Sequence, residues 1–81
     1  MIKVLFFAQI REIIGESSLE LQAQGQSISE LLRNLSQRNS RFALALQDKK
    51  VLCSVNKVLV DELYIIQDGD EVAFFPPVTG G

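Results

Sequence analysis

The chain has 81 residues with a formal net charge of −2, and 47% of its residues are hydrophobic. This length predicts one small domain, and the hydrophobic fraction is large enough for a packed core. The charges are scattered without a basic stripe and no apolar run approaches the length of a membrane span, which excludes nucleic acid and the membrane as expected partners.

The first third of the chain predicts two strands separated by a short helical turn. Residues 2–8 (IKVLFFA) form a continuous apolar run with β-branched and aromatic content, which is typical of a central strand. In residues 9–15, isoleucines recur at helical spacing, which predicts one helical turn ending at Gly15. Residues 18–23 alternate leucine with polar neighbours and predict a half-buried strand.

The strongest helix signal in the chain begins at Ser27. Ser27 is a favourable N-cap residue, and Glu30 three residues later completes a capping box. The apolar residues that follow share one helical face and are Ile28, Leu31, Leu32 and Leu35. This pattern predicts an ordinary amphipathic helix packed on a sheet, and it has no feature of a binding helix.

The next part of the chain predicts a second helix and a hairpin. Residues 41–47 (RFALALQ) fit both an alternating strand and a helical face, and their alanine and leucine content favours a short helix. Residues 51–55 and 58–60 predict two strands of a hairpin. The dipeptide Asn56-Lys57 stands where a tight two-residue turn would join them.

The last predicted strand determines the fold class. A turn at Asp68-Gly69 leads into an apolar strand over residues 71–75. The first and last strands are then the most apolar, and continuously apolar strands tend to be central in a sheet. A mixed sheet with these two strands in the middle and one main helix packed across it is the ubiquitin-like β-grasp arrangement. We therefore predict an α+β, β-grasp domain over residues 1–75.

The residue inventory argues against a self-sufficient enzyme. The chain has no histidine, which removes the commonest general base and all histidine-containing zinc sites. Asp68, Asp70 and Glu71 are too few for a calcium loop and are interpreted as a turn. Cys53 lies in an apolar strand and is interpreted as a buried small hydrophobe rather than a reactive thiol. No metal site is expected, and without a disulfide or a signal-peptide pattern we expect a cytoplasmic location.

The C-terminal stretch FFPPVTGG points to a functional tail. Pro76 and Pro77 cannot extend a β-ladder and favour an extended chain, so residues 76–81 would reach about 20 Å from the domain. Gly80 and Gly81 have no side chains, so a narrow channel could enclose them. The terminal carboxylate, with a pKa of about 3.3–3.7, is ionised and a poor electrophile, so acyl chemistry there needs activation, most simply by ATP-dependent adenylation. The alternative is a frayed terminus without function.

Four segments of the chain carry a resemblance to a known family: IKVLFFAQIRE, RFALAL, VNKVLV and DGDEVAFFPPVTGG. They resemble the small subunit of molybdopterin synthase, a ubiquitin-like sulfur carrier of the molybdenum cofactor pathway. The resemblance spans the whole chain and is most specific in the last segment. Residues 16–26 and the middle of the main helix match loosely, as surface positions would.

The resemblance implies that Gly81 carries sulfur. In this family an activating enzyme, similar to the ubiquitin-activating enzymes, uses ATP and magnesium to adenylate the terminal carboxylate, and a sulfur donor converts the acyl-adenylate to a thiocarboxylate. The tail then enters a pocket of the large subunit, where two such sulfur deliveries to cyclic pyranopterin monophosphate build the dithiolene. The tail residues that would enter the pocket are Pro76, Pro77, Val78, Thr79 and Gly80. The large subunit would supply the catalytic side chains, and the carrier would bind no permanent cofactor.

The resemblance also implies an apolar docking patch formed by Phe7, Leu59 and Phe75, in a heterotetramer with the two small subunits at the ends of a large-subunit dimer. From the residues alone, these three side chains fit the core of the domain equally well. Neighbours on a strand face opposite ways, so one member each of Phe6-Phe7 and Phe74-Phe75 must be exposed or covered by a partner.

Three other functions stay open at this point. The chain could carry sulfur for another pathway, such as thiamine synthesis. It could be a protein modifier that forms an isopeptide bond through Gly81, in which case lysines of target proteins would be the acceptors. It could also be a binding module that uses its sheet surface, in which case loss of the two terminal glycines would have no effect.

Overall fold

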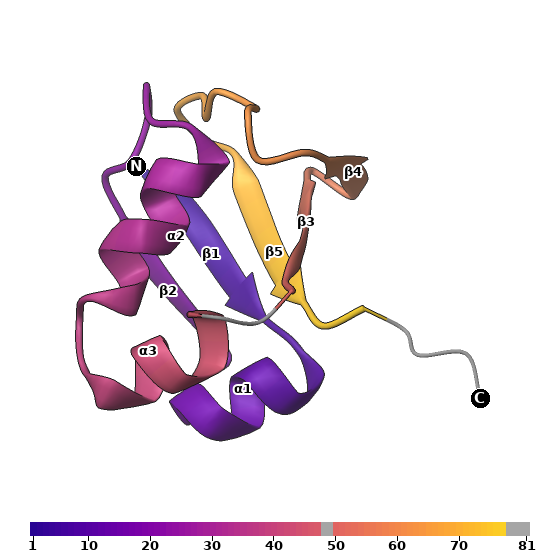
Figure 1. Ribbon diagram of the computed structural model, residues 1–81. Coiled ribbons are helices and arrows are strands. Elements are labelled where there is room, and N and C mark those ends of the chain that lie inside the picture. The colour runs from indigo at the N-terminus through magenta and orange to yellow at the C-terminus, as the bar shows by residue number, and fades with distance from the viewer. Residues whose placement is uncertain (48–49, 78–81) are drawn as a thin grey trace.

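Two strands from opposite ends of the chain form the centre of a mixed sheet in the computed structural model (Figure 1). The structure describes residues 1–47 and 50–77, which contain five strands and three helices. In chain order the elements are β1 (Ile2–Phe6), α1 (Ala8–Ile14), β2 (Ser18–Leu21), α2 (Ile28–Ser36), α3 (Ser40–Leu46), β3 (Leu52–Val55), β4 (Val58–Val60) and β5 (Glu71–Phe75). The strand order is β2-β1-β5-β3-β4, with β1 and β5 parallel and the other pairs antiparallel. The predicted β-grasp fold is confirmed.

The structure contains the predicted main helix and the short second helix, and the predicted helical turn after the first strand is longer than expected. The first strand stops at Phe6, and the predicted single turn is a helix of seven residues, α1, which ends at Gly15 with φ at 84°. The ambiguous segment around residues 41–47 is the helix α3. Its N-cap is Asn39, whose side chain accepts a hydrogen bond from the backbone N–H of Phe42 at 3.0 Å. This N-cap decides in favour of a helix over a strand.

The capping box predicted for α2 is present. The Ser27 hydroxyl accepts a hydrogen bond from the Glu30 N–H at 3.2 Å, and the Glu30 carboxylate accepts one from the Ser27 N–H at 3.0 Å. Leu31 and Leu35 on the predicted face are buried. The helix therefore packs on the sheet as the sequence pattern indicates. Its first two N–H groups, of Ile28 and Ser29, donate to the Tyr64 and Glu62 carbonyls, which joins its N-terminus to the loop before β5.

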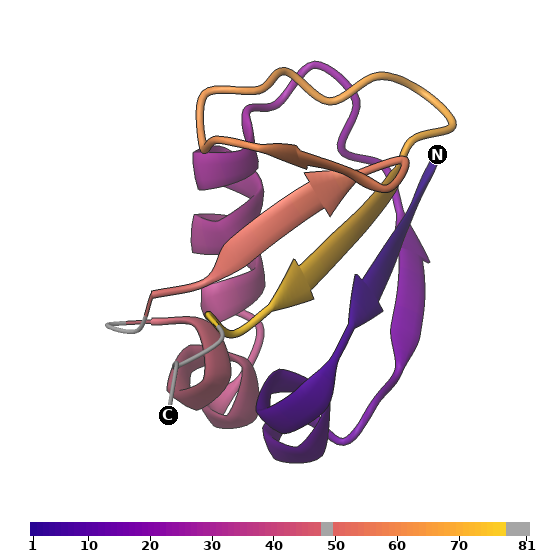
Figure 2. The ribbon, with the colours of Figure 1, turned by 90° about the vertical axis from the view of Figure 1, so that its right-hand side faces the viewer.

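The helices cover one face of the sheet and leave the other face without a helix among the described residues. α2 runs across the covered face, and α1 and α3 pack together at the end where β1 and β5 finish (Figures 1 and 2). Phe6 lies edge-on to Phe42, with ring centroids 5.8 Å apart, and is stacked with Phe74 at 6.4 Å. These three buried rings join the sheet to α3 at the centre of the core.

Two other sequence expectations concern membranes and metals. The helices in the described part of the chain are all too short or too polar to cross a membrane. In residues 1–47 and 50–77, no three acidic or cysteine side chains are grouped in a way that would hold a metal ion.

β5 ends at Phe75. The division into a domain over residues 1–75 and a tail over residues 76–81 stays a prediction.

Candidate functional site: the open face of the sheet

The uncovered face of the sheet carries a largely apolar surface. Side chains alternate along β5, so Val72 and Phe74 are buried against the helices while Ala73 and Phe75 face outward. Residues that lie opposite one another on neighbouring strands share a face. The strand register therefore joins one residue from each of four strands into an outward row: Leu5, Ala73, Ser54 and Leu59.

An open hollow of about 440 Å³ lies in this face, and we call it the open-face hollow. Its lining residues are Leu5, Phe7, Ser54, Lys57, Glu71, Ala73 and Phe75. Most of them are apolar, and Lys57 and Glu71 add one charge of each sign. A shallow apolar surface bordered by charges has the composition of a protein-docking site rather than of a catalytic pocket.

The structure brings two of the three predicted docking residues into this hollow. Phe7 is 43% exposed and Phe75 is half-buried, and both line it. Leu59 is 65% exposed and lies opposite Ser54, so its side chain shares the same face. Because Phe6 and Phe74 are buried, the expected alternation in both phenylalanine pairs is confirmed. The core interpretation is therefore wrong for Phe7 and Leu59.

Phe7 is held in position by a sharp change in the backbone. It is the N-cap of α1 with an extended conformation, and its N–H donates to the Phe74 carbonyl at 3.1 Å, one residue beyond β1. The next residue, Ala8, has φ at 54°, in the left-handed region that L-residues other than glycine rarely adopt. This turn ends the strand and leaves the Phe7 side chain on the open face.

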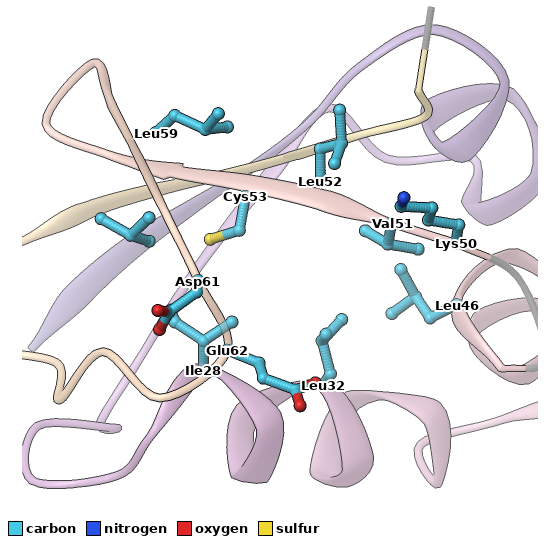
Figure 3. Close-up of a pocket in the computed structure, with 11 residues that line it drawn as sticks. Ile28, Leu32, Leu46, Lys50, Val51, Leu52, Cys53, Leu59, Asp61 and Glu62 are labelled. Atoms are coloured by element: carbon cyan, nitrogen blue, oxygen red, sulfur yellow. The ribbon is translucent and has the colours of Figure 1, made fainter. Parts of the chain in front are cut away.

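A second groove of about 460 Å³ lies between α2 and the β3–β4 hairpin (Figure 3). Its lining residues are Ile28, Leu32, Leu46, Lys50, Val51, Leu52, Cys53, Leu59, Val60, Asp61 and Glu62. Figure 3 shows the Cys53 thiol directed toward α2. Leu52 on β3 and Leu59 on β4 project away from α2. Burial raises the pKa of Cys53 to about 12, so the thiol is protonated at neutral pH and is a poor nucleophile. The prediction of a buried small hydrophobe is confirmed, with Cys53 only 5% exposed.

The predicted tail begins next to the helices α1 and α3. Pro76 and Pro77 are half-buried, and Pro76 lines a small hollow together with Ile10, Ile13 and Val51. The remaining predicted tail residues, Val78, Thr79, Gly80 and Gly81, lie outside the described residues. The role of Gly81 therefore stays a prediction from the sequence.

Asp70 has a structural role that its place in a polar turn does not indicate. Its carboxylate is buried, with 6% of the residue exposed. It accepts hydrogen bonds from Asn56, Tyr64 and the backbone of Gln67. A polar turn motif immediately before an apolar strand is compatible with either an exposed or a buried carboxylate, and only the fold brings the three donors to it.

Similarity to known proteins agrees with the fold and with the predicted resemblance. A model described as the ThiS family matches residues 4–81. The chain belongs to the ThiS family. This ThiS-family chain is 51% identical to the molybdopterin synthase sulfur carrier subunit of Escherichia coli (strain K12), and the match covers all of both chains. It is 42% identical, again over both full lengths, to the subunit of the same name from Haemophilus influenzae. The resemblance to this group of carriers is confirmed.

Two solved structures share the fold of this ThiS-family chain. One is a putative molybdopterin converting factor, subunit 1, from Pyrococcus furiosus, with a TM-score of 0.74, 27% identity and coverage of 95% of this chain and 97% of the other. The second is a complex of subunits 1 and 2 of molybdopterin-converting factor from Helicobacter pylori, with a TM-score of 0.70, 26% identity and coverage of 99% and 97%.

Proposed function

We propose that this chain is the sulfur carrier subunit of a molybdopterin synthase. The observation that carries the proposal is the 51% identity over both full lengths to a protein of that name. The composition agrees with a carrier, because the chain has no histidine and its one cysteine is a buried, protonated thiol. The catalytic side chains of the reaction would therefore belong to another protein.

The proposed chemistry takes place at the carboxylate of Gly81. An activating enzyme directs this carboxylate at the α-phosphorus of Mg-ATP, which forms the acyl-adenylate and releases pyrophosphate. Sulfide from the sulfur donor then attacks the acyl carbon, the bond to AMP breaks, and AMP leaves with a thiocarboxylate remaining on Gly81. Adenylation is needed because an ionised carboxylate is a poor acyl donor. The carrier itself would hold no permanent cofactor.

The proposed acceptor of the sulfur is cyclic pyranopterin monophosphate, bound on the large subunit. The tail from Pro76 to Gly80 would enter the pocket of that subunit and present the Gly81 thiocarboxylate to the acceptor. Two deliveries would build the dithiolene, and each would return Gly81 to a plain carboxylate. The Helicobacter pylori complex of two converting-factor subunits supports a large-subunit partner for this chain. The assembly would be a cytoplasmic heterotetramer.

We further propose that Phe7, Leu59 and Phe75 dock the carrier on its partners. Three observations support this role: their common face, the exposure of Phe7 and Leu59, and the open-face hollow that Phe7 and Phe75 line. Exposed apolar side chains gathered on one surface typically mark protein interfaces. Because the hollow lies beside the C-terminal end of β5, a docked partner would also be near the point where the tail begins.

Intact-mass measurement after incubation with the activating enzyme, Mg-ATP and a sulfide source tests the chemistry. We expect a gain equal to the exchange of one oxygen for sulfur, mapped to Gly81. A variant that lacks Gly81 serves as the matched control and should fold normally without any gain. An unchanged wild-type mass would sink the proposal in favour of a binding module. Conjugates with lysines of other proteins would instead identify a protein modifier.

A further inference from the structure

Asp70 is buried just before β5, and its carboxylate accepts three hydrogen bonds. Its Oδ1 accepts from the Asn56 Nδ2 at 3.0 Å, and its Oδ2 accepts from the Tyr64 hydroxyl and the Gln67 N–H, both at 2.9 Å. Its backbone carbonyl accepts from the Lys3 N–H at 3.1 Å. Asp70 therefore connects β1, the loop before β5 and the turn between β3 and β4.

Asn56 ties the tight turn of the β3–β4 hairpin to β5 through both its side chain and its backbone. Its Oδ1 accepts from the Glu71 N–H at 3.0 Å, and its own N–H donates to the Glu71 carbonyl at 2.9 Å. Asn56 and Lys57 have φ values of 50° and 71°, as a tight type I′ hairpin turn requires. Asparagine is among the few residues that adopt this conformation at low cost.

The hairpin that this turn forms carries part of the open face. Lys57 lines the open-face hollow, and Leu59 follows on β4, which is the last strand of the sheet and is paired with β3. β4 has three residues, so its ladder with β3 is short. Contacts between the turn and β5 thus add a second attachment for the part of the hairpin that carries Leu59.

We propose that Asn56 and Asp70 are positioning residues for partner docking, because together they fix the β3–β4 turn against β5 and so place Leu59 and Lys57 relative to Phe7 and Phe75. This inference rests on the proposed docking function of the open face. A purely structural role would lower the stability of the domain but leave the affinity of the folded molecules for the partner unchanged. The two roles therefore differ in a binding measurement.

The chemistry of the pair allows a reciprocal test. Asp70→Asn alone turns an amide NH₂ toward the Asn56 NH₂, and Asn56→Asp alone turns one carboxylate toward another, so each single change removes the contact. In the double variant, the new amide at position 70 can donate from its NH₂ to one oxygen of the new carboxylate at position 56. The oxygen of that amide then accepts from Tyr64 and Gln67, and the second oxygen of the carboxylate accepts from the Glu71 N–H. The swap therefore restores every hydrogen bond of the two side chains. Only the bond between positions 56 and 70 has its donor and acceptor exchanged.

Affinity is measured by calorimetric titration of the full chain into the purified large subunit from the same organism. We expect Asp70→Asn to raise the Kd by about tenfold and the double variant to return it to within about threefold of wild type. Asn56→Gly removes the side-chain hydrogen bonds to Asp70 and Glu71, while glycine keeps the left-handed turn and the backbone bond to the Glu71 carbonyl. It should also raise the Kd by about tenfold. Asn39→Ala, which removes the N-cap of α3 at the other end of the domain, is the control for lost stability and should bind like wild type.

Three results would overturn the inference. They are wild-type affinity in Asn56→Gly and Asp70→Asn, a folded double variant that does not recover affinity, and an equal loss of affinity in Asn39→Ala. If the wild-type chain itself does not bind the large subunit, the proposed function fails and the docking role fails with it. Amide exchange then tests separately whether Asp70 fixes the β3–β4 turn against β5. Asp70→Asn should then speed exchange of the Asn56 N–H and leave exchange of the N–H of Gln47, the C-cap of α3, unchanged. If Asp70→Asn changes the exchange rates of both amides by the same factor relative to wild type, Asp70 does not hold the β3–β4 turn against β5.

Discussion

Phe7 and Phe75, from opposite ends of the chain, line the same hollow on the open face of the sheet. The parallel pairing of β1 with β5 causes this proximity, because Phe6 lies opposite Phe74 and each following residue points outward. β3 is the other neighbour of β5, and its residue Leu52 lies opposite Phe75. Because paired residues share a face, the apolar surface continues onto β3. The part of the proposed docking surface that Phe7 and Phe75 form thus lies at the ends of the paired strands β1 and β5.

Replacement of Leu59 by serine should weaken partner binding without unfolding the domain. Leu59 is 65% exposed, so the free domain loses little buried apolar area, whereas a docked partner would lose an apolar contact. We expect about 2 kcal/mol of lost binding energy, or roughly a thirtyfold rise in Kd for the large subunit. Calorimetric titration measures this loss, and urea unfolding checks the stability.

Leu44→Ser is the matched control for this change. Leu44 is similarly exposed, at 61%, but lies on α3 rather than on the open face. Both variants should unfold at nearly the same urea concentration as the wild type. Equal affinity of Leu59→Ser and wild type would remove Leu59 from the docking surface, while equal weakening by both variants would mean that exposed leucines matter without regard to the face.

The sequence predicted the fold better than the site. Strand periods, the Ser27–Glu30 capping box and the apolar first and last strands were enough for the β-grasp fold, because each is a local signal with a global consequence. The alternation in the two phenylalanine pairs predicted that one member of each is not in the core, and only the family resemblance pointed to Phe7 and Phe75 as the outward ones. Asp70 could not be assigned, because its donors Asn56 and Tyr64 approach it only after the hairpin and the loop have folded.

Cys53 should resist thiol reagents in the native protein. Burial raises its pKa to about 12, well above the value of about 8.5 for an exposed thiol, so almost no thiolate forms at pH 8. We expect an alkylating reagent such as iodoacetamide to label the folded chain far more slowly than the chain in urea, with mass spectrometry as the readout. Fast labelling under native conditions would show that β3 opens readily or that the thiol is accessible.

The same pKa difference predicts a loss of stability at high pH. Because the folded-state pKa of Cys53 is raised, its contribution is fully present below about pH 8.5 and is lost as the pH rises toward 12. Cys53→Ala has no thiol to ionise and should show a flatter stability profile between these limits. If the free energy of unfolding falls by the same amount between pH 8 and pH 10 in both proteins, ionisation of Cys53 does not cause the loss.

Asp70 should make the domain sensitive to acid. Burial acts to raise the pKa of Asp70, but the hydrogen bonds from Gln67, Asn56 and Tyr64 together outweigh it and leave the pKa below its ordinary value. Its contribution is therefore present above about pH 3.9, the ordinary value for an unfolded chain, and is lost as the pH falls further through the folded-state pKa. Urea unfolding between pH 6 and pH 2 should show this loss in the wild type, beginning at about pH 3.9.

The double variant with exchanged Asn56 and Asp70 provides the control for acid sensitivity. It keeps the same number of carboxylates and moves one of them to a turn position, so its acid profile should shift while its stability near neutral pH stays close to wild type. Asp70→Asn should have a lower free energy of unfolding than wild type at pH 6. The difference in free energy between the two proteins should narrow as the pH falls below about 3.9. A difference that is constant across this range would mean that ionisation of Asp70 makes no contribution.

Ala8→Gly should stabilise the domain, which is the opposite of the usual effect of glycine in a helix. Ala8 has φ at 54°, where an L-residue with a Cβ is strained by roughly 1–2 kcal/mol and glycine is not. The greater freedom of glycine in the unfolded chain offsets part of this gain, so we expect a net stabilisation of about 0.5–1 kcal/mol in urea unfolding. Ala43→Gly in α3 is the same substitution at an ordinary helical position and should destabilise by about 1 kcal/mol. If both glycine variants are destabilised alike, the backbone at Ala8 is not strained, and the turn that places Phe7 on the open face has another cause.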